Sequence, residues 1–71
     1  MRLEQFLYLQ EIHRTHSINL AAKKLHVSQQ NISQSIRNLE SELDLILLER
    51  STAGTNLSPA GLIVLKHAQR I

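Results

Sequence analysis

This 71-residue sequence has no cysteine and no tryptophan, and it has few glycines, prolines and aromatic residues. Without cysteine it can form neither disulfide bonds nor thiolate metal sites. Phe6 and Tyr8 are the only aromatic residues, too few for a platform on which the bases of a single strand could stack. The two glycines do not form a glycine-rich loop that could cradle phosphates.

Long apolar runs are also missing, since none approaches the ~20 residues that a membrane-spanning helix needs. Residues 1–7 include Glu4 and Gln5 inside their apolar stretch, which is not typical of a signal peptide. A chain of 71 residues lies near the lower limit for independent folding, so we expect one domain with a small core. We expect this domain to be soluble and cytoplasmic, with no membrane partner.

The side-chain inventory does not fit an enzyme. The sequence offers no nucleophile and base whose spacing would bring them together. His13 and His16 are three residues apart, but they flank a predicted helix end and no third metal ligand lies near them. We therefore expect no catalytic residue, no metal and no other cofactor.

Residues 29–43 have the pattern of an amphipathic helix with an unusual polar face. The apolar side chains follow one another at steps of four, three and four, and they are Ile32, Ile36, Leu39 and Leu43. The opposite face, at 100° per residue, carries Gln30, Gln34, Arg37 and Ser41, flanked by Ser33 and Asn38. A solvated face usually mixes lysine with glutamate, whereas amides and hydroxyls with one arginine suit the base edges of a DNA major groove.

The preceding residues predict a helix-turn-helix. A short helix should begin near Asn19 as its N-cap and end near Leu25, with Leu20, Ala21 and Leu25 facing inward. His26 and Val27 should form the turn, and Ser28 should cap the helix that follows.

The flanking segments complete a mainly α fold, a winged helix-turn-helix. A first helix is predicted over residues 3–14, with a ridge formed by Leu3, Phe6, Leu9 and Ile12. Gly54 favours a hairpin wing over residues 52–55, between short strands near residues 47–50 and 56–57. Ser58 and Pro59 predict the start of a last helix, which divides the chain into residues 1–57 and residues 58–71. This helix has no stop signal, and we expect a longer protein.

Charge gives weaker support for a nucleic-acid partner. The net charge is +2 and the isoelectric point is near 9.5, as in many ordinary domains. The positions are more informative, because the cations in or beside the helix-turn-helix are Lys23, Lys24, Arg37 and Arg50. The acids Glu40, Glu42 and Asp44 come in and just after the C-terminal part of residues 29–43.

Five motifs occur in order along the chain. They are L-x-x-F-x-Y-L at 3–9, S-I-x-x-A-A-x-x-L-x-V-S-Q at 17–29, I-S-x-x-I-x-x-L-E at 32–40, L-x-x-x-L-L-x-R at 43–50 and L-S-P-A-G at 57–61. Together they make the sequence resemble the N-terminal DNA-binding domain of LysR-type bacterial transcriptional regulators. The resemblance implies binding to double-stranded promoter DNA as a homodimer or a dimer of dimers. It also implies that residues 1–57 are a DNA-binding domain and that residues 58–71 begin a linker or dimerisation helix, which pairs antiparallel with that of a second copy. A small-molecule effector would be sensed by a C-terminal domain outside this chain.

The helix pattern and the resemblance together predict two sets of site residues. The residues expected to contact DNA are Asn19, Lys24, Ser28, Gln29, Gln30, Asn31, Ser33, Gln34, Arg37, Arg50 and Thr52. The residues expected at the dimer interface are Leu62, Leu65, Ala68 and Ile71. Arg37 could touch phosphate, guanine or neither. Arg50 could instead form a structural ion pair with Glu40 or contact the backbone. A different reading is a protein-interaction module that uses the apolar face of the last helix.

The sequence departs from the family pattern at several positions. His16 and Asp44 stand where the family usually has glycine. With His16, the end of the first helix should turn less sharply. Asp44 ends the helix over residues 29–43, and aspartate tolerates the left-handed region moderately. Gln30 and Asn31 replace a common Pro-Ala and should change the preferred bases. Ala53 stands where many members have a wing arginine.

Overall fold

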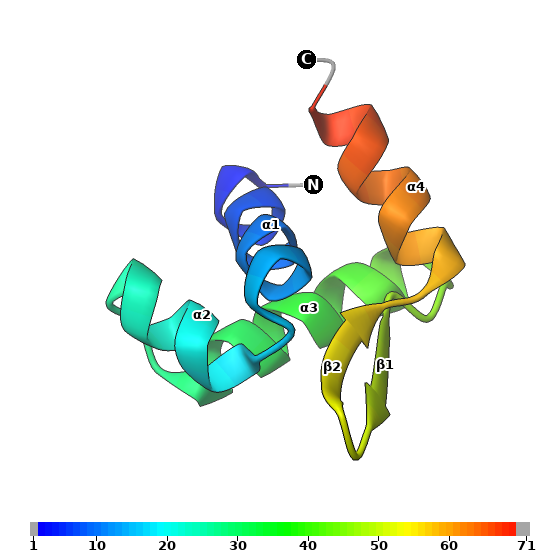
Figure 1. Ribbon diagram of the computed structural model, residues 1–71. Helices are drawn as coiled ribbons and strands as arrows, with labels where there is room; N and C mark the ends of the chain where they lie inside the picture. The colour runs from blue at the N-terminus through cyan, green and yellow to red at the C-terminus, as the bar shows by residue number, and fades with distance from the viewer. Residues whose placement is uncertain (1, 70–71) are drawn as a thin grey trace.

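The computed structural model describes residues 2–69 and has the predicted winged helix-turn-helix architecture (Figure 1). Its elements are α1 (Leu3–Thr15), α2 (Ile18–Leu25), α3 (Gln29–Leu43), β1 (Leu48–Ser51), β2 (Gly54–Leu57) and α4 (Pro59–Ala68). The predicted bounds of α3 are confirmed, and α1 extends one residue further than expected. The antiparallel hairpin of β1 and β2 and helix α4 lie on one side of α1, with α2 on the other (Figure 1).

Serine hydroxyls cap the N-termini of three helices. The Oγ atoms of Ser17, Ser28 and Ser58 accept hydrogen bonds from the backbone N–H three residues later, at 3.0–3.1 Å. The caps at Ser28 and Ser58 are as predicted, but the cap of α2 is Ser17 and not Asn19. Ser17 has the extended backbone that a cap requires, whereas Asn19 already lies inside the first turn of α2.

Three helices end in the left-handed region without glycine. His16, His26 and Asp44 have φ angles of 58°, 58° and 55°. The expectation of a less sharply turned α1 end was wrong, because the His16 N–H donates to the Ile12 carbonyl at 2.7 Å in this conformation. Asp44 adopts the left-handed conformation as predicted.

The core is formed where α1, α2 and α3 pack against one another and against Leu47, Leu57 of β2 and Leu65 of α4. Its fully buried large side chains are Leu9, Ile12, Ile32, Ile36, Leu39 and Leu47. Leu3, Leu20 and Leu43 were expected to face inward but are exposed. Leu3 and Leu43 lie at the ends of their helices, and Leu20 lies 200° around α2 from buried Ile18.

The wing is fastened to the turn between α1 and α2. The Thr55 N–H donates to the His16 carbonyl at 2.9 Å, and His16 Nδ1 lies 2.5 Å from Asn56 Oδ1. Gly54 has a φ of 127°, and a Cβ atom added there would lie 2.5 Å from the His16 oxygen. Glycine at this position therefore permits both the hairpin turn and the close approach of the wing.

Two polar side chains connect α3 to its surroundings. Glu40 Oε2 accepts hydrogen bonds from the Leu47 and Leu48 N–H groups, at 2.8 and 3.4 Å, and so fixes the loop that leads into β1. Gln5 of α1 is buried and donates to the Ser35 carbonyl at 3.2 Å.

Within residues 2–69, the helices are all too short or too polar to cross a membrane.

Candidate nucleic-acid interface

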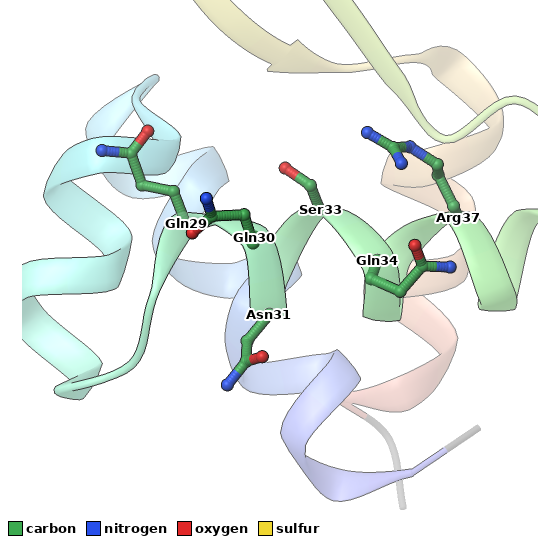
Figure 2. A pocket seen from close by; sticks show the side chains of 6 residues that line it. All are labelled: Gln29, Gln30, Asn31, Ser33, Gln34 and Arg37. Carbon is green, nitrogen blue, oxygen red and sulfur yellow. The ribbon is translucent and has the colours of Figure 1, made fainter.

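The outer face of α3 forms a shallow polar hollow at the surface. The residues that line it are Gln29, Gln30, Asn31, Ser33, Gln34 and Arg37 (Figure 2). All of these are exposed except Ser33, which is half-buried. The buried stripe of Ile32, Ile36 and Leu39 holds the opposite face of α3 against the core, so the polar face must point outward.

Three of these side chains project on one side of α3. Gln29, Ser33 and Arg37 follow at steps of four and point toward the side where the hairpin lies, whereas Asn31 points the other way (Figure 2). The polar face is therefore continuous with the wing.

Two further hollows join α3 to the wing. Asn19, Gln29, Ser33, Arg50 and Thr52 share one hollow with the α1–α2 turn. Ser33 also lines the second hollow, together with Arg37 and Glu40 of α3 and Arg50 of β1. The structure thus brings most of the predicted DNA-contacting residues together on one surface.

Two predicted residues are placed differently. Lys24 is exposed in the last turn of α2 and lines none of these hollows. The Ser28 hydroxyl accepts a hydrogen bond from the Asn31 N–H as the N-cap of α3.

Some of the amides are held by neighbouring side chains. Gln29 Nε2 donates to Asn19 Oδ1 of α2 at 3.2 Å. Gln34 Nε2 donates to Asn38 Oδ1, one turn further along α3, at 2.9 Å. Asn38 was expected only to flank the polar face, although its spacing of four from Gln34 is typical of a hydrogen-bonded pair on a helix.

The cations near α3 do not form ion pairs with carboxylates. Among residues 2–69, the ion pairs are Arg2–Glu4 at 3.8 Å and Glu11–Arg14 at 2.6 Å, where the hydrogen bond from Arg14 lowers the pKa of Glu11. The alternative ion pair between Arg50 and Glu40 is not formed, and Glu40 Oε2 instead accepts from the Leu47 and Leu48 N–H groups. Within the described residues, neither Arg37 nor Arg50 forms an ion pair, although Glu40 lines the same hollow as both, so both guanidinium groups have donors for phosphates.

Helix α4 has an apolar face of which only a part is exposed. Leu62 and Ile63 are 43% and 59% exposed, and Ala68 is half-buried. Leu65 is only 4% exposed and packs in the core, so it cannot serve at a dimer interface as expected. Ile71 lies outside the described residues.

Comparison with known proteins decides the family. Residues 3–62 match the family described as bacterial regulatory helix-turn-helix protein, lysR family. The chain belongs to the lysR family. Its full length is 39% identical to part of the HTH-type transcriptional regulator TcbR of Pseudomonas sp. (strain P51), of which it spans 24%. The curated relatives are transcriptional regulators and not enzymes.

Solved structures of lysR-family domains have the same fold. The DNA-binding domain of CbnR in complex with DNA is 38% identical, with a TM-score of 0.89 over 99% of this chain and 80% of that one. The DNA-binding domain of BenM in complex with a benA site is 33% identical, with a TM-score of 0.87 over 99% and 81%. This chain is therefore a DNA-binding domain like those of lysR-family transcriptional regulators.

Proposed function

We propose that this lysR-family domain binds double-stranded DNA sequence-specifically, with α3 in the major groove. The observation that carries the proposal is the exposed face of α3, on which Gln29, Gln30, Asn31 and Gln34 present four amides at the N-terminal half of the helix. Each amide offers the donor and acceptor that match N7 and N6 of adenine. The N-terminal part of a recognition helix is also where base contacts are made in helix-turn-helix proteins.

Arg37, Arg50 and Lys24 are proposed to attract the DNA backbone. Arg50 and Thr52 lie on the wing beside α3, where they would meet the DNA backbone next to the groove. Arg37 lies further along α3 and lines a second hollow together with Arg50. Lys24 lies outside these hollows and would contribute attraction to phosphates without reading bases.

The whole protein is proposed to be a dimeric transcriptional regulator of the bacterial cytoplasm. The chain spans about a quarter of the curated relatives' length, which leaves room in a longer protein for a domain that senses a small-molecule effector. Leu62 and Ile63 give α4 an exposed apolar strip that would pair with α4 of a second copy.

The same strip could instead bind an unrelated protein, and a DNA-binding experiment separates the two readings. Duplexes of random sequence would be selected on the full-length protein, and binding to the enriched site would be measured over a range of salt concentrations. We expect one enriched sequence and an affinity that falls steeply with salt, because phosphate contacts release counterions. Failure to enrich any sequence, with weak and salt-independent binding, would contradict the proposal and favour the protein-interaction reading.

A further inference from the structure

The hydrogen bond between Gln34 and Asn38 joins two exposed amides of α3, of which Gln34 lies on the face that we propose to meet DNA and Asn38 lies at its edge. Gln34 Nε2 donates to Asn38 Oδ1 at 2.9 Å. We propose that Asn38 is a positioning residue for sequence recognition, which holds the Gln34 amide in the orientation that reads a base pair. This inference rests on the proposed function, since it requires α3 to lie in the major groove.

Counting donors and acceptors shows that the contact leaves Gln34 free to read a base. A glutamine amide has two N–H donors and one carbonyl oxygen. Asn38 accepts from one N–H, which leaves the second N–H and the oxygen of Gln34. A bidentate contact with adenine uses the oxygen and the N–H on the same side of the amide, so the inference requires that Asn38 binds the other N–H.

The contact also selects one of two amide orientations. Without a partner, the amide can rotate and exchange the places of its nitrogen and oxygen, which would present the wrong pattern to the same base. Because Asn38 presents its oxygen, the Gln34 nitrogen points along α3 toward its C-terminal end (Figure 2). A side chain already ordered in the free protein also loses less conformational entropy on binding.

The surroundings of Asn38 favour the same orientation. Gln34, Asn38 and Glu42 follow one another at steps of four and line one hollow. Arg2 and Glu4 line the same hollow, and they form an ion pair with each other at 3.8 Å. Because a carboxylate only accepts hydrogen bonds, Glu42 would favour the orientation in which the Asn38 –NH₂ group points toward it and the Asn38 oxygen points toward Gln34.

A purely structural role for this pair is the alternative, since Gln–Asn pairs at a spacing of four stabilise helices slightly. The pair of Gln29 and Asn19 provides an internal comparison, because it orients a different amide of the same face from α2. A positioning role of Asn38 should therefore affect the base pair that Gln34 reads and leave the others unchanged.

The test is a double-mutant cycle on the full-length protein with a site selected by the wild type. Gln34→Ala first identifies the base pair whose preference is lost. Asn38→Ala should then lower discrimination at that base pair by about three- to tenfold, with unchanged discrimination elsewhere and an unchanged melting temperature. In the Gln34→Ala background, Asn38→Ala should cause no further loss. Asn38→Asp keeps an acceptor and should retain discrimination, while its charge weakens binding to all DNA.

Several results would overturn the inference. They are unchanged discrimination in Asn38→Ala, an equal loss at every base pair, a loss that adds to that of Gln34→Ala, and a loss in Asn38→Asp as large as in Asn38→Ala. Failure of the proposed function would be recognised separately, since the wild type would then select no sequence. If the wild type selects a site and Gln34→Ala loses one preference, only the role of Asn38 is in question.

Discussion

Neighbouring residues of α3 serve opposite purposes. Ile32 and Ile36 are almost fully buried, whereas Gln30 and Gln34, two positions before each of them, are exposed. The helical period alone separates them, since two positions correspond to a rotation of 200°. This division was predictable from the sequence because the apolar steps along α3 are regular.

Ile36 provides the residue-scale test of this division. Replacing Ile36 by alanine should lower the free energy of unfolding by about 2–4 kcal/mol, because the side chain is 1% exposed and its removal leaves a cavity. Thermal or denaturant unfolding measures the change. Ile46→Ala is the matched control, since Ile46 is 68% exposed and should cost little. Equal stability of the two variants would show that the inward face of α3 is assigned wrongly.

At the scale of elements, local signals predicted more than long-range contacts. The caps at Ser28 and Ser58 were predictable because each depends on residues within one turn. The start of α2 was missed because Ser17 and Asn19 are both good N-cap residues. The fastening of the wing to His16 was not predictable, since the His16–Asn56 contact joins residues 40 apart.

The candidate site, like the fold, was predictable where it depends on local pattern and not where it depends on long-range packing. The amide-rich face of α3 followed from its period, and the structure places Arg50 and Thr52 of the wing beside it. Local patterns could not decide whether Arg50 pairs with Glu40 or whether Leu65 is buried, because both depend on how distant elements pack. The role proposed for Asn38 rests on side-chain positions that the sequence does not provide.

The contact of Glu40 with the loop before β1 gives the prediction at this scale. Glu40→Ala should lower the free energy of unfolding by about 1–3 kcal/mol, because the N–H of buried Leu47 would lose its acceptor. Glu42→Ala removes the same charge from an exposed position of α3 and is the control. Hydrogen exchange should show the loss of protection at Leu47. If the two variants unfold alike, the Glu40 contact does not stabilise the loop.

At the scale of the whole molecule, the exposed apolar strip of α4, Leu62 and Ile63, is proposed to form the dimer interface. In the longer protein that we propose, including residues after Ile71 should strengthen dimerisation, since more of the apolar seam is then present. Ile63→Glu should weaken the extended dimer without unfolding the domain, because Ile63 is 59% exposed. Sedimentation velocity over a range of concentrations measures both effects. A purely monomeric extended chain at high concentration would count against the linker role of α4.

The most direct test of the central claim compares Gln34→Ala with Lys24→Ala on selected and random duplexes. Gln34 lies centrally in the hollow of α3, whereas Lys24 lies in α2 and outside it. Gln34→Ala should weaken binding to the selected site by roughly 1–3 kcal/mol and leave binding to random DNA nearly unchanged. Lys24→Ala should weaken both about equally and reduce the salt dependence. If Gln34→Ala, still folded, weakens selected and random DNA by the same factor, α3 is not the element that reads sequence.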